Sequence, residues 1–145
     1  MVAQMTIYSP DDLMLQLSRL GDVDEYAPEI LNAGIDPLFK KIKENAEKYR
    51  RTGEMAKSLK KKKAKKDRRG TWQQRVQFEG YDKTRKPTKS DPRGVPNARK
   101  AMSLEYGTKN QPATPFIRPA IIQSEKECIE RMQERFNSVV DKIKG

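Results

Sequence analysis

Two prolines that stand just ahead of a long apolar stripe limit how the last third of this chain can fold. Gly107 follows an aromatic residue, and glycine there favours a backbone turn that other residues adopt only at a cost. Pro115 and Pro119 come next, and proline suits the first turn of a helix because its ring fixes φ and no intrahelical hydrogen bond is lost. The expected buried stripe of that helix contains Ile122, Ile129, Met132, Phe136, Val139 and Ile143. These residues predict a rigid turn that leads into a long C-terminal helix.

Helical signals also dominate the N-terminal third. Ser9 and Pro10, followed by two aspartates, are typical of a helix start, and Gly21 can end that helix. Its expected buried stripe contains Leu13, Leu17 and Leu20. The next stripe contains Leu31, Ile35, Leu38, Ile42, Ala46 and Tyr49. Pro37 lies inside this second region, so either a new helix begins at Asp36-Pro37 or the helix kinks there.

The middle of the chain changes to the period of two that is typical of a β-strand. Over residues 71–80, apolar side chains alternate with polar ones, and the expected buried face contains Trp72, Val76 and Phe78. Arg69-Gly70 could make a hairpin turn in front of this strand. Residues 82–97 carry three prolines and almost no apolar side chains, which is typical of a functional loop or of one that orders when a partner arrives. Asn97 is expected to cap a short helix after it.

These elements predict an α+β fold, with N-terminal helices and a long C-terminal helix packed on a small antiparallel β-sheet, and with a long proline-rich loop. A chain of 145 residues can build one modest core, so we expect a single domain over residues 1–145. The only cysteine, Cys128, excludes a disulfide within the chain and a cysteine-rich zinc site. We expect its thiol to be buried as a small hydrophobe.

Histidine is absent, which removes the commonest general base and the commonest metal ligand. The chain has no run of about 18 apolar residues and no secretory pattern at its N-terminus. We therefore expect an intracellular protein that is not an enzyme, does not enter a membrane, and uses no cofactor or metal.

The net charge of +11 is concentrated in one stretch, because residues 40–69 hold 15 basic and 4 acidic side chains and the rest of the chain is balanced. Its densest part is the basic segment 57–69, whose candidate contact residues are Lys60, Lys61, Lys62, Lys63, Lys65, Lys66, Arg68 and Arg69. They could contact the phosphate backbone of DNA, dock on an acidic protein partner, or stay solvated and deter pairing at a sheet edge. No aromatic residue is interleaved with the lysines, which argues against stacking on single strands.

Two short cassettes resemble the signature of a bacteriophage family. The first contains Glu105-Tyr106-Gly107-Thr108 and then Pro115-Phe116-Ile117-Arg118-Pro119-Ala120. It resembles the Glu-aromatic-Gly-Thr and Pro-Phe-x-Arg-Pro-Ala motifs of the minor tail or tail-completion proteins of long-tailed phages, found at the head–tail neck. The second, residues 52–59, looks like the step from the long helix to the sheet in that family, and its matching residues are Thr52, Gly53 and Ser58.

The resemblance implies a structural virion protein, assembled in the cytoplasm of the bacterial host, that forms a ring with six-fold symmetry in most cases. The ring would complete the tail and join it to the head-side connector or stopper ring. Its other neighbour would be the tail tube or the tail terminator, and genomic DNA would pass through its lumen. The resemblance also implies a strand within the basic segment.

In this interpretation the cassette side chains have structural roles. Glu105 and Arg118 could pair with each other or across a subunit boundary, or form an exposed pair of little energetic weight. Phe116 is expected to be an anchor in the core or in an interface. Thr52 and Ser58 are expected to cap backbone groups between the helix and the strand.

Other functions stay open at this point. The protein could be the tail terminator ring, or a small basic nucleic-acid-binding protein that relies on the basic segment. A packaging nuclease built on Asp82 and Asp91 is the enzyme alternative, although the acidic residues are scattered along the chain.

Overall fold

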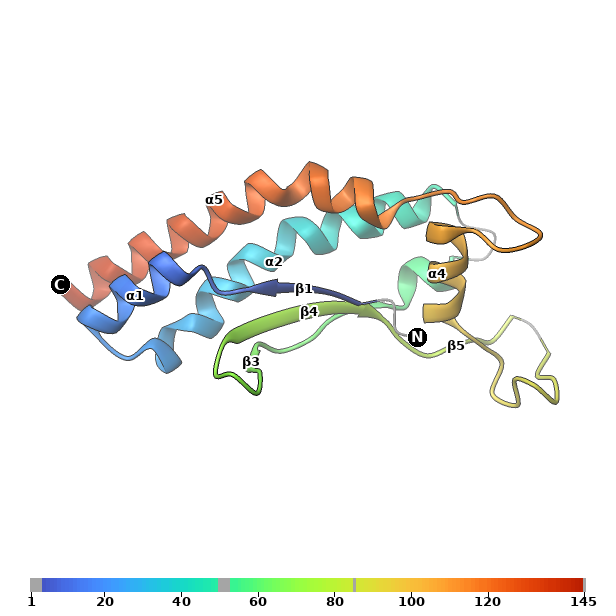
Figure 1. Ribbon diagram of the computed structural model, residues 1–145, viewed down its shortest axis with the longest axis horizontal. Helices are drawn as coiled ribbons and strands as arrows, with labels where there is room; N and C mark the ends of the chain where they lie inside the picture. Colours follow the sequence, from blue (N-terminus) through green and yellow to red (C-terminus); the bar gives the residue numbers. More distant parts are fainter. Residues whose placement is uncertain (1–3, 50–52, 85, 145) are drawn as a thin grey trace.

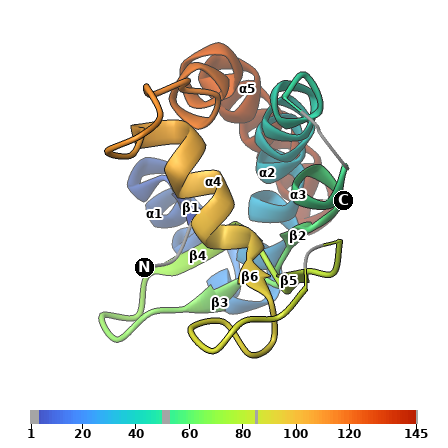
Figure 2. The same cartoon turned by 90° about the vertical axis from the view of Figure 1, so that its right-hand side faces the viewer.

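Two long helices lie side by side, and one of them packs on a small antiparallel sheet (Figures 1 and 2). The computed structural model describes residues 4–49, 53–84 and 86–144. In chain order the elements are β1 (Gln4–Tyr8), α1 (Asp11–Leu20), α2 (Val23–Glu47), α3 (Glu54–Lys57), β2 (Leu59–Lys61), β3 (Lys65–Lys66), β4 (Trp72–Phe78), β5 (Tyr81–Asp82), β6 (Val95–Pro96), α4 (Asn97–Tyr106) and α5 (Ile117–Lys144). The layers run from α5 through α2 to the sheet, so the expected α+β class is confirmed.

Strand β4 is the centre of the sheet. It pairs antiparallel with β1 along one side and with the short strands β2 and β3 along the other. Val76 and Phe78 are buried against the helices, as the alternation predicts. Trp72 is only half-buried, because its indole N–H donates to Asp24 at the edge of α2 at 3.0 Å. The hairpin turn before β4 is confirmed: the Gly70 N–H donates to the Asp67 carbonyl, and Gly70 has a φ of +82°.

The contact between α2 and α5 combines small and large residues, and Gly34 of α2 lies against Met132 of α5. A Cβ on Gly34 would lie 2.3 Å from Met132 Cγ, so the helices approach too closely for a side chain there. On α5 the buried positions are Ile117, Ala120, Ser124, Cys128, Met132, Phe136 and Val139. The prediction that Ile122 and Ile129 belong to this stripe is wrong, because the buried stripe follows positions 117, 120, 124, 128, 132, 136 and 139 and the two isoleucines are exposed beside it.

The N-terminal helices differ from the sequence prediction at their ends. Helix α1 begins at Asp11 with no side-chain cap, so Ser9 does not cap it, while Gly21 ends it as expected. Leu20 is exposed and is not part of the buried stripe. Helix α2 continues through Pro37 as one element, so no new helix begins at Asp36-Pro37. Pro37 itself is buried. Tyr49 is exposed and does not belong to the predicted buried stripe, because α2 ends at Glu47, before Tyr49.

The proline-rich region is tied at its base by a two-stranded ribbon. Strands β5 and β6 pair between Tyr81 and Pro96, and the loop between them projects from one end of the molecule (Figure 1). Asn97 does not cap α4, because it is the first residue of that helix and its side-chain amide donates to the Glu79 carbonyl. None of the helices in the described ranges is long and apolar enough to cross a membrane.

Candidate functional site

The Glu105 carboxylate is the centre of the C-terminal cassette. It is buried at the end of α4 and accepts three backbone hydrogen bonds, from Phe116 at 2.7 Å, Ile117 at 2.8 Å and Arg118 at 2.9 Å. These N–H groups open α5, where no intrahelical acceptor exists, and the next residue, Pro119, has no N–H to satisfy. A negative charge is also favourable at a helix N-terminus. Glu105 is therefore a cap supplied from another helix.

This geometry replaces the expected ion pair between Glu105 and Arg118. Glu105 binds the backbone of Arg118, and within the described residues the Arg118 guanidinium forms no salt bridge. The side chain of Arg118 is exposed beside the start of α5. The hypothesis that the Glu105 and Arg118 side chains pair within one chain is thus wrong, because the Glu105 carboxylate instead accepts the first backbone N–H groups of α5.

The residues between Glu105 and α5 return the chain to the core. Gly107 has a φ of +79°, and a Cβ on it would lie 2.7 Å from the Ala113 nitrogen, so only glycine fits. The Thr108 N–H donates to the Gln111 carbonyl at 2.8 Å and closes the next turn. The exposed Pro115 then leads into the helix. Tyr106 points outward and is 72% exposed.

Phe116 connects this cassette to the sheet and to α2. It is fully buried, its ring meets Phe78 edge-on at 5.9 Å between centroids, and its carbonyl accepts from the Asn45 side chain at 3.1 Å. In this chain Phe116 is a core anchor. The other cassette reaches the same core, because Met55, in the short helix after Gly53, belongs to the same hydrophobic cluster.

At that second cassette, Gly53 has a φ of +80° and precedes α3, and the Ser58 hydroxyl donates to the Met55 carbonyl at 2.6 Å. Ser58 thus bonds a backbone group at the step from helix to strand. Thr52 lies outside the described residues. The two cassettes are far apart in sequence, but Met55 and Phe116 belong to the same hydrophobic cluster. The described residues of both cassettes therefore help to hold the fold together.

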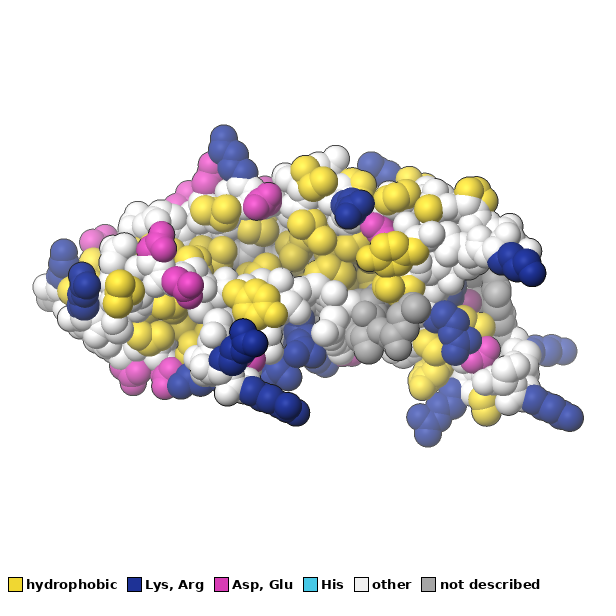
Figure 3. Space-filling model, viewed as in Figure 1, with side chains coloured by type: hydrophobic (Ala, Val, Ile, Leu, Met, Phe, Trp, Pro, Cys, Tyr) yellow, Lys and Arg dark blue, Asp and Glu magenta, His cyan; other side chains and the backbone are white. Residues whose placement is uncertain are grey.

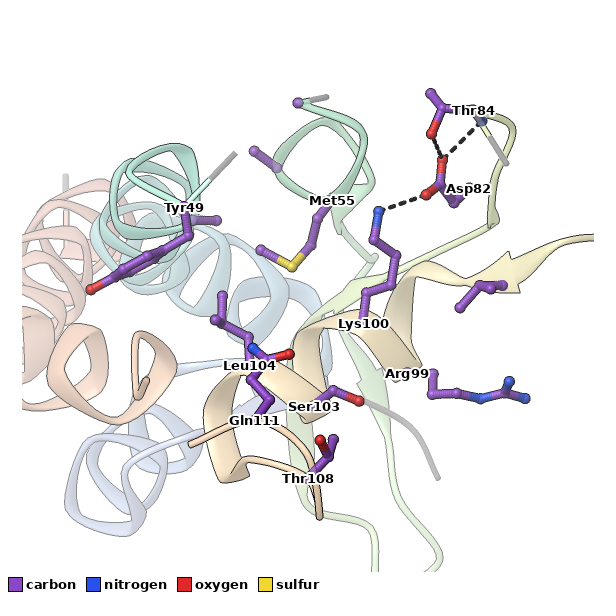
Figure 4. Close-up of a pocket in the computed structure, with 14 residues that line it drawn as sticks. Tyr49, Met55, Asp82, Thr84, Arg99, Lys100, Ser103, Leu104, Thr108 and Gln111 are labelled. Atoms are coloured by element: carbon purple, nitrogen blue, oxygen red, sulfur yellow. Dashed lines mark hydrogen bonds and ion pairs between the residues drawn. The ribbon is translucent and has the colours of Figure 1, made fainter. Parts of the chain in front are cut away.

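A buried ion pair near this end was missed by the sequence analysis. Asp82 is 1% exposed, and its carboxylate accepts from Lys100 Nζ at 2.8 Å and from the Thr84 N–H at 2.9 Å (Figure 4). These bonds, with that of Lys100 first, hold the pKa of Asp82 far below its usual value of 3.8. The pair lies at the wall of a cleft between α4, α3 and the end of α2. Asp91 instead pairs with Arg99 at 2.8 Å, so the two aspartates of the nuclease alternative are held by different cations.

Three lysines of the basic segment are already paired. Lys61 reaches Asp36 at 2.5 Å, Lys62 reaches Glu79 at 2.5 Å, and Lys66 reaches Asp24 at 2.7 Å. The hydrogen bond from Lys66, and then that from Trp72, lowers the pKa of Asp24; Lys62 lowers that of Glu79 in the same way. Within the described residues, the basic members of the segment without an ion pair are Lys57, Lys60, Lys63, Lys65, Arg68 and Arg69.

An apolar groove lies between the start of β1, the end of α4 and the first turns of α5. Its walls include the exposed side chains of Tyr106, Ile121 and Ile122, and Ile129 continues the surface along α5. Ile122 and Ile129 are 69% and 56% exposed. Figure 3 shows apolar side chains across the face of the molecule on which β1, α1 and α5 lie. Exposed apolar surface of this kind is typical of an interface.

Comparison with known families gives one result. The family model described as "Bacteriophage HK97-gp10, putative tail-component" matches residues 11–84, which is half of the chain. The matched range contains α1, α2, the basic segment and the central strand, and it ends before the cassette at residues 105–120. No curated protein and no solved structure matches the chain.

Proposed function

Because the chain belongs to the HK97-gp10-like family of bacteriophage tail components, we propose that it is a subunit of the phage neck that completes the tail and joins it to the head. The family match is the observation that carries this proposal, and it makes the protein a structural component of the virion. The cassette at residues 105–120 supports it independently, since it lies outside the matched range and resembles tail-completion proteins.

The subunit would act as a member of a homo-oligomeric ring, most often six-fold. A ring requires two different faces on each subunit, because contacts in a closed ring run head to tail. The two edges of the sheet differ in the way that this requires. The β2–β3 edge carries lysines, which deter strand pairing, whereas β1 has no charged residue between Gln4 and Tyr8 and adjoins the apolar groove.

We assign the groove beside β1 to a second copy of the chain. Tyr106 and Ile122 would supply buried apolar anchors, and Arg118 beside them would supply charge that sets the register. One face of the ring would contact the head-side connector, and the opposite face would contact the tail tube or the tail terminator. This function needs no catalytic residue.

The test of the proposed function is deletion of the gene in its own phage genome, followed by electron microscopy of the lysate. Full heads beside separate tails of normal length are the expected result. Overlong tails would instead assign the protein to tail termination, and intact infectious particles would overturn a structural role at the neck.

The groove has its own test, which is complementation of that deletion by variants. Ile122→Asp places a charge in the groove and should abolish complementation while leaving the thermal unfolding midpoint nearly unchanged, because the side chain is exposed. Gln123→Asp is the matched control, since Gln123 is the next residue of α5 and lines a different surface. If both variants complement the deletion equally, the groove is not an interface between subunits.

A further inference from the structure

The face of the sheet that points away from the helices is polar and basic. Cross-strand neighbours place Lys60 beside Gln77 and Lys65 beside Gln73, on the side opposite the buried Val76 and Phe78. Thr6 lies opposite Arg75 on the same face. Both α2 and α5 lie on the other side of the sheet (Figure 2). The accessible part of this surface, which we call the open face, is made of Gln4, Thr6, Tyr8, Lys60, Lys65, Arg75 and Gln77, whereas Gln73 is buried.

The strand register explains which lysines of the basic segment are free. Lys61 lies opposite Val76 and Lys66 opposite Trp72, so both point toward the helices and reach the aspartates of α2. Lys60 and Lys65 point the other way and form no salt bridge among the described residues, although the charge of Lys60 helps to lower the pKa of Glu79. The register thereby separates Lys61 and Lys66, which form ion pairs, from Lys60 and Lys65, which form none among the described residues.

Two basic loops flank the open face. The hairpin between β3 and β4 carries Arg68 and Arg69, and the loop between β5 and β6 carries further exposed cations. Both loops project to the side away from α5 in two perpendicular views (Figures 1 and 2). In Figure 3, basic side chains extend outward at both places. The described cations of the second loop are Lys83, Lys86, Lys89 and Arg93.

Acidic groups near these cations are already bound. Asp67 accepts the backbone N–H groups of Arg69 and Thr71. Glu79 binds Lys62, and Asp91 binds Arg99. Within the described part of the chain, the cations of the open face and of its two loops therefore form no salt bridge.

We propose that the open face and its two flanking loops bind the phosphate backbone of duplex DNA. Cations spread over a sheet and two loops suit repeated phosphates along a duplex, and the side chains of Gln4 and Thr6 add hydrogen-bond donors. Tyr8 is the one exposed aromatic residue among the residues of the open face, so stacking of single-stranded bases has little support. Binding should be independent of sequence. The inference uses charge and register alone and does not depend on ring formation or head joining.

The test is fluorescence anisotropy of the full chain with a labelled random duplex of about 30 base pairs at several salt concentrations. We expect micromolar binding at low salt that weakens steeply as salt rises, as for any contact with several phosphates. Lys60→Gln/Lys65→Gln should weaken binding about tenfold and lower the slope of log affinity against log salt by about two. Lys86→Gln/Lys89→Gln should have a similar effect.

The control is Lys61→Gln/Lys66→Gln, which removes the same number of charges from the same segment but on the helix side of the sheet. It should leave the salt slope nearly unchanged, with circular dichroism confirming that each variant is folded. Equal loss in the control and in Lys60→Gln/Lys65→Gln would overturn the proposed face. Absence of duplex binding by the wild-type chain at low salt would overturn the proposal as a whole. If the outward lysines were still required for phage assembly in that case, the surface would be a dock for an acidic protein.

Discussion

The Glu105 carboxylate accepts the backbone N–H of Phe116 at 2.7 Å, from a position eleven residues earlier in the chain. The bond joins the end of α4 to the start of α5 and holds Phe116 against Phe78. A side chain in one helix thus completes the N-terminus of another. The Glu and Pro-Phe parts of the cassette are two halves of one capping arrangement, which explains why they occur together in this chain.

Removing the acceptor should destabilise the protein. Glu105→Ala leaves two buried N–H groups and one part-buried N–H group without this acceptor, so we expect a loss of about 3 kcal/mol in the free energy of unfolding. Glu105→Gln should lose about 2 kcal/mol, because an amide NH2 group would face a backbone donor. Urea denaturation followed by circular dichroism measures both. Glu125→Gln, an exposed change on α5, is the control. Equal stability of all variants would show that the cap contributes nothing to the free energy of unfolding.

The Asp82–Lys100 pair should make stability depend on pH. The folded-state pKa of Asp82 lies below its unfolded value of 3.8, so its contribution is complete above that value and is lost as pH falls toward the folded pKa. Lys100→Met should therefore cost about 2 kcal/mol at pH 7 and progressively less below about pH 4. Urea denaturation at pH 7, 5 and 3 tests this.

The comparison for that pair is Lys62→Met, which breaks a more exposed contact with Glu79. It should cost less than about 1 kcal/mol at pH 7. A Lys100→Met penalty that stays constant down to pH 3 would contradict the linkage to Asp82.

Gly34 allows α2 to pack closely against Met132 of α5. Gly34→Ala places a Cβ where Met132 Cγ lies 2.3 Å away, so Met132 must move and we expect a loss of about 2 kcal/mol. Calorimetry measures the shift in the unfolding midpoint. The double variant Gly34→Ala/Met132→Ala should be less destabilised than the sum of the single variants, because the truncated side chain makes room. Simple additivity would mean that this contact does not set the spacing.

Cys128 should react slowly with thiol reagents. Burial in the core raises its pKa, so little thiolate forms and the sulfur is inaccessible. At pH 8 we expect labelling about 100-fold slower than in urea-unfolded protein, with a rate that follows opening of the α2–α5 contact. Because the chain has one cysteine, absorbance at the reagent wavelength reports this site alone. Labelling as fast as in urea would contradict the buried position.

Local periodicity was sufficient for the types of the main elements. The alternation around Val76 and Phe78 predicted the buried face of β4, and the glycine and prolines of residues 105–120 predicted a turn before a helix. The wrong predictions of buried positions came from the same use of local spacing. Ile122 and Ile129 are apolar and helical in spacing, yet they are exposed because a neighbouring stripe of α5, which includes Ser124 and Cys128, is the one that is buried.

The sequence by itself determined the main helices, the central strand, the turn at residues 105–120 and the family, since these depend on neighbours along the chain. It did not predict β1 or the β5–β6 ribbon, whose pairing joins distant residues. Tertiary structure alone decided which lysines are free, which carboxylate caps α5, and that Asp82 is paired with Lys100. Those outcomes depend on strand register and on contacts between residues far apart in the chain, which local spacing does not encode. A shift of one residue in the pairing of β2 with β4 would exchange Lys60 and Lys61 between the two faces of the sheet.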